Sequence, residues 1–341
     1  MRVLITGHLG FIGAVMVPLV QEAGCEVAGL DTGLYDGCDF GARVAPIREI
    51  RADIRDVDGS VLRGFDAIIH LAALSNDPLG DLDAQLTYDV NHLATVRLAA
   101  LAREAGVGRF LFSSSCSNYG AAGDTLLDES SAFNPVTPYG ISKVRAETDL
   151  LKLASDRFSP VLLRSATAYG ASPRLRSDIV LNNLTAHAVA TGKVLIKSDG
   201  TPWRPIVHVE DICRAFIAAL EAPREAIHAQ AFNVGRPDEN YRVRQLAEIV
   251  RDTVPDCELN FAGDASPDAR NYRVDCSKIA RMLPAFAPQW NARKGAAELY
   301  EAYRSRGISI DDIEGHRYRR IGQIKRLLSS GKLDTALRWK A

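Results

Sequence analysis

The sequence predicts an α/β fold in which a doubly wound parallel sheet is accompanied by a smaller C-terminal substrate-binding lobe. Short apolar runs alternate with helical stretches over the first half of the chain. A glycine-rich turn joins the first apolar run to the first helical stretch. The chain has 341 residues, of which 47% are hydrophobic, so it can form one large core and a second lobe.

A helical stretch follows most of the predicted strands. We expect the strands at residues 2–7, 26–31, 47–54, 66–73, 109–114 and 160–166. We expect helices at 11–24, 84–105 and 138–155. Pro18 should kink the first helix without ending it, because the apolar face continues on both sides. Right-handed crossovers place such helices on both faces of a parallel sheet, which makes the fold doubly wound.

The second half of the chain is less regular and returns once to the sheet. Its predicted elements are a helix at 178–191, a strand at 204–209, a helix from 210, a sheet strand at 231–235 and a helix at 242–253. We therefore expect a cofactor domain at 1–170 plus 205–235, and a substrate lobe at 171–204 plus 236–341. The basic stretch at 316–334 is predicted to be a solvated helix face or a subunit contact.

Composition and charge argue against several classes of protein. The net charge is −1, whereas a protein that follows nucleic-acid phosphates normally carries a basic excess. No apolar run approaches the ~20 residues that span a bilayer, and the N-terminus does not have the form of a signal peptide. The 6 cysteines form no CxxC or CxxH pair, which disfavours a zinc site and a disulfide framework. We expect a cytoplasmic enzyme with reduced thiols, no metal, no nucleic-acid partner and no membrane contact.

The stretch TGHLGFIG predicts a dinucleotide site. It places Gly7, Gly10 and Gly13 between a strand and a helix, where glycines allow a tight turn and close approach of a pyrophosphate to the helix N-terminus. Asp31 ends the second strand, at the offset where a carboxylate binds the adenosine ribose and repels a 2′-phosphate. Asp53 follows the next strand and either contacts adenine or caps a turn. This pattern predicts a Rossmann-type site for NAD.

Polar side chains follow the fifth strand, at the sheet edge where such folds bind ligands. The run at 113–115 is SSS, and the later stretch TPYGISK places Tyr139 and Lys143 four residues apart. With Thr137 as the cap, both lie on one face of a helix. Lys143 and a positively charged nicotinamide would lower the pKa of Tyr139 from about 10 toward neutrality, so that the phenolate could act as a base.

Together these motifs resemble the extended short-chain dehydrogenase/reductase family, specifically its NAD-dependent nucleotide-sugar epimerases and dehydratases. The resemblance covers nearly the whole chain and includes TGHLGFIG, ADIRD, HLAALS, DVNHLAT, FSSSCSNYG, PYGISK, RPIVHVED and DARNYRVDCSK. It implies catalytic roles for Ser115, Tyr139 and Lys143. It also implies a homodimer that packs through the two long helices of the cofactor domain.

The resemblance further implies binding residues for the cofactor and for a nucleotide-diphosphate sugar. The implied cofactor contacts are Gly7, Gly10, Phe11, Ile12, Gly13, Asp31, Asp53, Ile54, Leu71, Ala72, Ala73, Asn91, Ser113, Tyr139 and Lys143. The implied substrate contacts are Ser75, Ser115, Ser117, Asn118, Thr167, Asn182, Arg204 and Arg270. The chain departs from many relatives at Thr167, where they have Asn, and at Ala171, where they have Pro.

The resemblance implies a transient 4-keto sugar, formed when C4 passes hydride to NAD. The family's 4,6-dehydratases carry an Asp–Glu pair after their Ser or Thr, and here the pair is Cys116–Ser117. We therefore expect epimerisation at C4. The alternatives are a 3- and/or 5-epimerase, a 4,6-dehydratase and a non-catalytic NAD-binding regulator. The reactive cysteine of 3,5-epimerising relatives falls on Ser117, so we expect Cys116 to be a buried, inert thiol.

Overall fold

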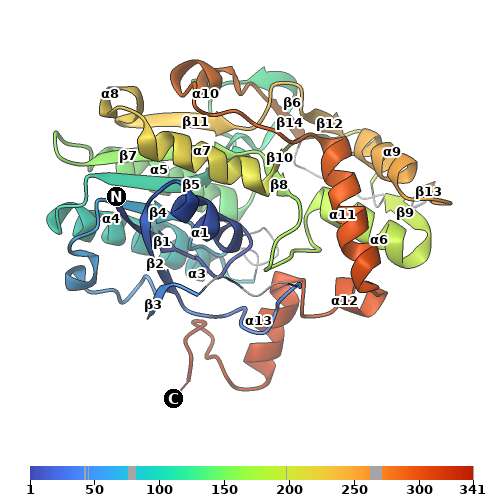
Figure 1. The fold of residues 1–341 in the computed structure, drawn as a ribbon, viewed down its shortest axis with the longest axis horizontal. Helices are drawn as coiled ribbons and strands as arrows, with labels where there is room; N and C mark the ends of the chain where they lie inside the picture. The colour runs from blue at the N-terminus through green and yellow to red at the C-terminus, as the bar shows by residue number, and fades with distance from the viewer. Residues whose placement is uncertain (42–43, 45, 76–81, 197, 262–270, 341) are drawn as a thin grey trace.

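The structure is a computed structural model that describes the chain except residues 42–43, 45, 76–81, 197, 262–270 and 341. Its main feature is a seven-stranded parallel sheet with strand order β11-β7-β5-β4-β1-β2-β3 (Figure 1). The strands are β1 (Arg2–Thr6), β2 (Glu26–Asp31), β3 (Arg48–Arg51), β4 (Ala67–His70), β5 (Arg109–Ser115), β7 (Ser159–Ser165) and β11 (Gln230–Val234). The predicted doubly wound fold is confirmed. The strand order reverses between β1 and β4, which is where ligands bind in such sheets.

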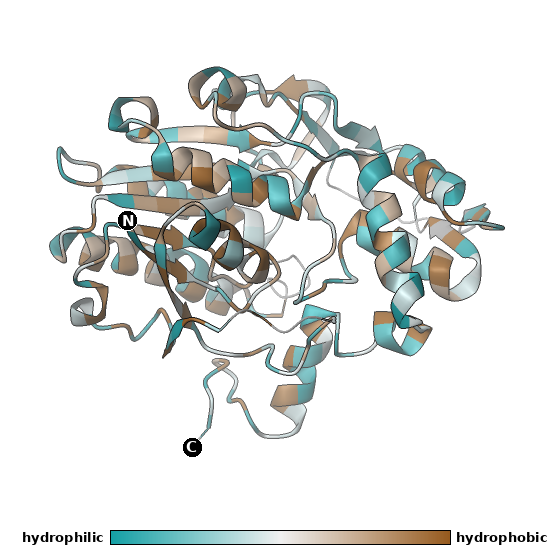
Figure 2. Cartoon of the chain, viewed as in Figure 1, coloured by the Kyte–Doolittle hydropathy of each residue, from teal (hydrophilic) through white to brown (hydrophobic). Residues whose placement is uncertain are grey.

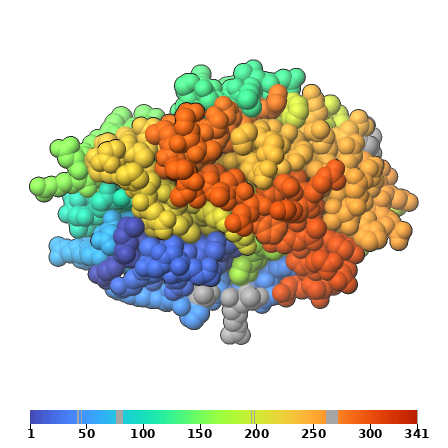
Figure 3. Space-filling view, turned by 45° about the horizontal axis from the view of Figure 1, so that its top comes forward, coloured from blue at the N-terminus to red at the C-terminus, as the bar shows by residue number. Residues whose placement is uncertain are grey.

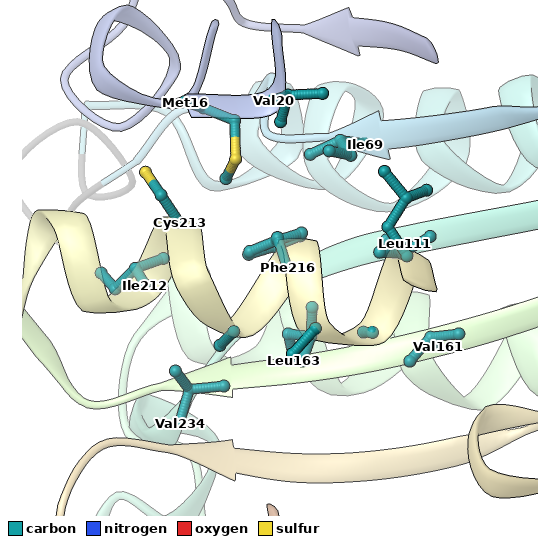
Figure 4. Close-up of a cluster of buried hydrophobic side chains, with 14 of the residues drawn as sticks. Met16, Val20, Ile69, Leu111, Val161, Leu163, Ile212, Cys213, Phe216 and Val234 are labelled. Atoms are coloured by element: carbon teal, nitrogen blue, oxygen red, sulfur yellow. The ribbon is translucent and has the colours of Figure 1, made fainter. Parts of the chain in front are cut away.

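Helices cover both faces of the sheet. One face packs against α1 (Gly13–Glu22) and α7 (Val209–Glu221), and the other against α4 (Ala94–Glu104) and α5 (Pro138–Leu151). Alternate strand residues point to opposite faces. Thus Leu111 joins Met16 and Phe216 in one cluster (Figure 4), whereas Phe110 and Phe112 join the cluster on the other face. Figure 2 shows hydrophobic residues along the central strands.

Several predicted elements differ from the structure in extent. Helix α1 continues through Pro18, as expected. The predicted helix at 84–105 consists of α3 (Ala84–Tyr88), a π-helical turn η2 (Asp89–Leu93) and α4. The π turn contains Asn91, whose side chain accepts a hydrogen bond from Leu74 N at 2.8 Å and donates one to Leu74 O at 3.0 Å. Asn91 and Leu74 are far apart in sequence, so this pairing is a tertiary contact, and helical periodicity does not predict it.

The second lobe is built on three helices and small sheets. Its helices α6 (Val180–Thr191), α9 (Val243–Thr253) and α11 (Ala292–Arg306) share one hydrophobic cluster. The small sheets pair β12 (Asn240–Arg242), β10 (Trp203–His208) and β8 (Thr167–Tyr169), then β13 (Glu258–Phe261) with β9 (Lys193–Ile196), and β14 (Asn271–Val274) with β6 (Ala121–Leu127). Short elements complete the fold: η1 (Gly59–Leu62), η3 (Cys116–Tyr119), α8 (Arg224–Ile227), α10 (Ser277–Met282) and α12 (Ile310–Glu314).

The segment at 205–235 returns only partly to the large sheet. Helix α7 and strand β11 belong to the cofactor domain, but β10 pairs with β8 and β12 instead. The reverse holds for α10, which the sequence assigns to the lobe. Its Ile279, with Leu283 and Phe286, joins the cluster of α1 and α7. Figure 3 shows this orange C-terminal surface beside the yellow and blue surfaces of α7 and α1.

The basic C-terminal tail, defined here as residues 316–340, packs against the cofactor domain. The sequence assigns it to the lobe as a solvated face or subunit contact; the structure instead seats helix α13 (Arg320–Ser329) below the sheet (Figure 1). Four apolar residues of the tail share a cluster with Leu74 and Leu86; they are Ile324, Leu327, Leu333 and Leu337. The basic residues of α13 lie beside an apolar stripe, and burial of that stripe fixes the helix.

Over the residues that the structure describes, no helix has both the length and the apolar character needed to cross a bilayer.

Candidate active site

A cavity lies at the carboxyl ends of the strands, at the switch point between β1 and β4. It is partly open to solvent. Most of the residues predicted to contact the cofactor line it, namely Gly7, Gly10, Phe11, Ile12, Gly13, Asp31, Asp53, Ile54, Leu71, Ala72 and Ala73. Ser75, predicted to contact the substrate, lines it too. Asn91, Ser113, Tyr139 and Lys143 are not among its lining residues.

The glycine turn fits a dinucleotide because side chains are excluded from it. Gly7 has φ +74°, and a Cβ there would lie 2.7 Å from Ala72 N. A Cβ on Gly13 would lie 2.3 Å from the carbonyl oxygen of Gly7. The turn therefore brings bare backbone to the cavity wall where α1 begins. A helix N-terminus approached this closely is suited to a phosphate anion.

Two carboxylates mark the outer half of the cavity. Asp31 at the end of β2 accepts hydrogen bonds from Leu9 N at 3.1 Å and Gly33 N at 2.9 Å, which orients its carboxylate. Asp53 accepts from Arg55 N at 2.8 Å, so it caps its turn as well as lining the cavity. Burial alone would raise the pKa of Asp53, but hydrogen bonds and charge from Arg55 hold that pKa below its ordinary value.

Tyr139 and Lys143 occupy the first turns of α5. Thr137 caps this helix by accepting a hydrogen bond from Gly140 N at 3.2 Å, and Pro138 occupies the first helical position. The Lys143 ammonium donates to Ser113 O at 2.7 Å and lies 5.7 Å from the centre of the Tyr139 ring. Burial lowers the pKa of Lys143 to about 7, although the charge of Glu147 acts in the opposite direction.

Ser115 stands where β5 ends and η3 begins. Its hydroxyl accepts a hydrogen bond from Ser117 N at 3.1 Å and donates one to Ser117 Oγ at 3.0 Å. Both serines are half-buried, so their hydroxyls border the strand end instead of entering the core. Thr167 is likewise half-buried, on β8.

Beneath this strand end lies a buried polar network that sequence reasoning missed. Arg164 donates from Nε and Nη2 to the carboxylate of Glu147, with Nη2–Oε2 at 2.7 Å. Ser114 and Asn118 donate to the same carboxylate, Asn118 at 2.9 Å. Asn118 is therefore a fully buried member of this network, and the expectation that its side chain touches the sugar is not supported. The available signal was the placement of Glu147 one turn after Lys143, on the same helical face.

Cys116 is turned away from the site. Its Sγ lies 3.1 Å from Arg164 O and its side chain is fully buried. Burial raises the pKa of this thiol well above its ordinary value. Cys116 is therefore buried, as expected, and its lack of reactivity stays a prediction.

Two predicted substrate contacts, Asn182 and Arg204, are buried, and a third lies outside the described residues. Asn182 uses its amide entirely on backbone, accepting from Gly170 N at 2.9 Å and donating to Gly170 O and Arg176 O at 3.0 Å. It braces the loop before α6, and its contact with a phosphate or sugar stays a prediction. Arg204 is buried and donates to Trp203 O at 2.7 Å. Arg270 lies outside the described residues.

The tail supplies part of the cavity wall, which the sequence did not predict. Arg320 and Leu337 line the cavity, as does Arg176 from the loop after β8. The tail is further held by Trp339 Nε1, which donates to Thr32 O at 2.8 Å, and by Ala336 O, which accepts from Arg55 at 2.8 Å. These contacts join residues about three hundred positions apart, so no local sequence pattern predicts them.

No cluster of His, Cys, Asp and Glu side chains suited to a metal ion occurs within the described part of the chain.

Comparison with known proteins gives relatives that act on nucleotide sugars and catalyse different reactions. The family model for the NAD dependent epimerase/dehydratase family matches residues 3–235. A UDP-glucose 4-epimerase of Mycolicibacterium smegmatis is 30% identical over 322 residues, which are 90% of this chain and 99% of that enzyme. A dTDP-glucose 4,6-dehydratase of Streptomyces niveus is 28% identical over 89% of this chain and 93% of its own. The structure of MoeE5 in complex with UDP-glucuronic acid and NAD superposes with a TM-score of 0.78, at 27% identity, over 90% of this chain and 100% of that one.

Proposed function

Since the chain belongs to the NAD-dependent epimerase/dehydratase family, we propose that it is a nucleotide-sugar epimerase that inverts C4. The relatives include both epimerases and dehydratases, so the family alone leaves the reaction open. The choice rests on the residues that surround Tyr139. It also rests on a cavity whose walls suit NAD.

Binding of NAD is supported by the cavity at the switch point. The bare backbone of Gly7, Gly10 and Gly13 would face the pyrophosphate, and Asp31 the adenosine ribose. The Asp31 carboxylate would repel the additional phosphate of NADP, which favours NAD. When bound, NAD would supply the hydride acceptor and donor for C4 of the sugar.

The residues of the chain move the proton. Tyr139 as phenolate takes the proton of the 4-hydroxyl while C4 loses hydride, which leaves a ketone; the reverse transfer restores the hydroxyl. Ser115 would hydrogen-bond the same oxygen. The Lys143 ammonium, near the Tyr139 ring, favours the phenolate because opposite charges attract.

The observation that carries C4 epimerisation is the chemistry of the strand end at 113–119. Beside the two hydroxyls of Ser115 and Ser117 it carries no carboxylate, and its thiol, Cys116, is directed into the core. The nearest buried carboxylate, Glu147, is paired with Arg164. Loss of the 6-hydroxyl or removal of a proton from C3 or C5 needs a further acid or base, and this strand end supplies none.

The test is turnover of UDP-, dTDP-, GDP- and CDP-sugars in deuterated water without added cofactor. We expect one 4-epimer with no deuterium at C3 or C5, because the hydride returns from bound NAD. Tyr139→Phe should reduce kcat by about 10²–10⁴-fold, the usual worth of a general base, and should still retain NAD.

Other products would contradict the proposal in distinguishable ways. Deuterium at C3 or C5 would indicate a 3- or 5-epimerase, and a 6-deoxy-4-keto product a dehydratase. Strict dependence on added NADPH with net reduction would indicate a ketoreductase. If neither wild type nor Tyr139→Phe turns over any of these sugars, the protein would instead be a non-catalytic NAD-binding regulator.

A homodimer is part of the proposal. Leu93 on η2 is 54% exposed and Leu151 at the end of α5 is 39% exposed, and η2 packs against α5. Large apolar side chains exposed on this pair of helices are suited to burial against a second copy. Sedimentation should show a dimer for wild type and a monomer for Leu93→Asp; a monomeric wild type would contradict it.

We also place the reaction in the cytoplasm. All 6 cysteines are free thiols, and four of them are buried. Free thiols persist in a reducing compartment. Localisation of the tagged protein to another compartment would refute this part.

A further inference from the structure

Two buried arginines line the cavity, and only one of them has an acidic partner among the residues that the structure describes. Arg176, on the loop between β8 and α6, pairs through Nε with Asp178 at 2.8 Å. Arg320, the first residue of α13, is 2% exposed. Among the described residues it has no carboxylate at ion-pair distance. Its guanidinium donates one hydrogen bond, from Nη2 to Arg174 O at 2.9 Å, and lies 4.1 Å from the centre of the Tyr35 ring.

Such a guanidinium needs a counter-charge. Burial lowers the pKa of Arg320 below its ordinary value, and the nearby charges of Tyr35 and Asp178 do not offset that effect. A buried cation without a partner is costly, and the nearby carboxylate of Asp178 is already paired with Arg176. Nε and Nη1 of Arg320 remain for an acceptor in the cavity that this side chain lines.

The loop that carries Arg176 runs from the glycine turn to the residues after β4. Ser172 Oγ donates to Phe11 O at 2.8 Å, and Arg176 Nη1 lies 3.4 Å from Ser75 O. Arg320 is fixed to the same loop through Arg174 O. Both guanidiniums line the same cavity as the glycine turn from which α1 begins. A dinucleotide places its pyrophosphate at such a helix N-terminus.

We infer that Arg320 and Arg176 bind the pyrophosphate of NAD, so that the C-terminal tail is a component of the cofactor site. The inference rests on the proposed function only in taking NAD as the cofactor. A planar guanidinium offers two parallel N–H donors to phosphate oxygens, which suits this anion better than an ammonium. The pairing would balance a charge that the protein alone leaves uncompensated.

The experiment is calorimetric titration of cofactor-free, full-length protein with NAD, ADP-ribose and adenosine. Arg320→Met should weaken binding of NAD and ADP-ribose by about 10–100-fold, the usual worth of hydrogen bonds to a charged group, and leave adenosine unchanged. Arg320→Lys should lose less, since it keeps the charge. The double variant Arg176→Met, Asp178→Asn should act as Arg320→Met does. The matched control is Arg319→Met, because Arg319 is exposed and adjacent; it should bind as wild type does.

Each contrary result has a separate meaning. If Arg320→Met binds ADP-ribose as wild type does, the inference is wrong. The same holds if it loses affinity for UDP-glucose but not for ADP-ribose, because the anion would then be the substrate diphosphate. If Arg320→Met displaces the tail, binding of adenosine should weaken as well, and Arg320→Lys then separates the two explanations. Retention of ADP-ribose binding by Arg320→Lys would support a role for the positive charge, and loss of that binding would refute it. Failure of wild type to bind NAD at all would refute the proposed function instead.

Discussion

At the scale of single residues, Lys143 is a buried cation close to the candidate base Tyr139, and burial makes its charged form unfavourable. Its ammonium is buried on α5 and is held by the Ser113 carbonyl and the Phe112 ring, 4.6 Å from the ring centre. Burial lowers its pKa to about 7, which means that folding disfavours the charged form. The free-energy cost of burying this charge arises at the position from which the ammonium would favour the Tyr139 phenolate.

Lys143→Met should stabilise the cofactor-free protein while it abolishes turnover. An unfolded chain keeps a lysine protonated to about pH 10.4, whereas folded Lys143 releases its proton near pH 7. Between these values the unfolded state binds more protons, so wild-type stability rises with pH. The variant should therefore melt higher than wild type at pH 7, by about 2–4 °C per kcal/mol gained, and the difference should shrink toward pH 10.

Scanning calorimetry from pH 6 to 10 measures this difference. Lys325→Met, which removes an exposed lysine of α13, is the control and should follow wild type at every pH. The prediction is wrong if Lys143→Met melts at a lower temperature than wild type, and by the same amount at pH 7 and at pH 10. That result would show that the lysine stabilises the fold.

Residues within contiguous motifs were predictable, and residues defined by tertiary contact were not. Gly7, Gly13 and Asp31 line the cavity as their spacing predicts. Asn118 follows the serine run in sequence, yet its side chain turns into the Glu147 network. Arg320 belongs to the cavity only because an apolar stripe on α13 seats it there. Local pattern encodes the first group, and packing alone encodes the others.

At the scale of elements, the start of α5 determines where Tyr139 lies. The helix begins directly after its Thr137 cap and Pro138, so Tyr139 falls in the first turn, where helices fray most readily. Lys143 follows one turn later and is anchored to β5. The cap therefore connects helix stability to the position of the candidate base.

Thr137→Ala should lower the free energy of unfolding by about 1 kcal/mol, the usual value of an N-cap. It should also lower kcat more than it changes KM, because fraying displaces Tyr139 and leaves the distant nucleotide contacts in place. Thr137→Ser should restore both quantities. Urea unfolding and steady-state kinetics provide the measurements.

Asn291→Ala is the matched control, since Asn291 caps α11 in the other lobe by accepting from Lys294 N at 2.9 Å. It should cost similar stability and leave kcat unchanged. Equal losses of kcat in both variants would mean that general destabilisation, and not the position of Tyr139, explains the effect.

Elements with strong periodicity were predicted, and weakly patterned ones were not. All seven strands of the large sheet were expected, including the short strand β3 within 47–54. Strand β6 has the sequence AAGDTLL, which lacks alternation, and it forms because β14 pairs with it. The π turn η2 likewise depends on Asn91 reaching Leu74.

At the scale of the whole molecule, the tail connects the end of the chain to the cofactor domain. Leu333 and Leu337 are buried beside Leu74, and Arg338 pairs with Asp56 and lies 3.4 Å from Asp53. Bound NAD would be covered by these residues on its outer side. Release of NAD would then require the tail to detach.

Removal of residues 331–341 should accelerate NAD dissociation by about tenfold or more, since burial of even one leucine is worth about 1.5–3 kcal/mol. The measurement is loss of bound NAD after dilution, followed by absorbance or fluorescence. In the full-length protein, Leu337→Ser should also accelerate NAD dissociation. Ala336→Ser, at an exposed neighbour, should not. Dissociation rates equal to wild type in both the truncated protein and Leu337→Ser would refute the role of the tail.

The position of Arg320 and Leu337 also orders events during protein synthesis. The glycine turn and every strand of the large sheet precede residue 235, whereas the residues that cover the cavity come after residue 319. A ribosome that adds about 5–20 residues per second needs several seconds to cross that interval. During those seconds the growing chain has an uncovered cavity, and the cofactor can enter before the outer wall exists. Entry of the cofactor could then precede the end of translation, whereas its enclosure would follow it.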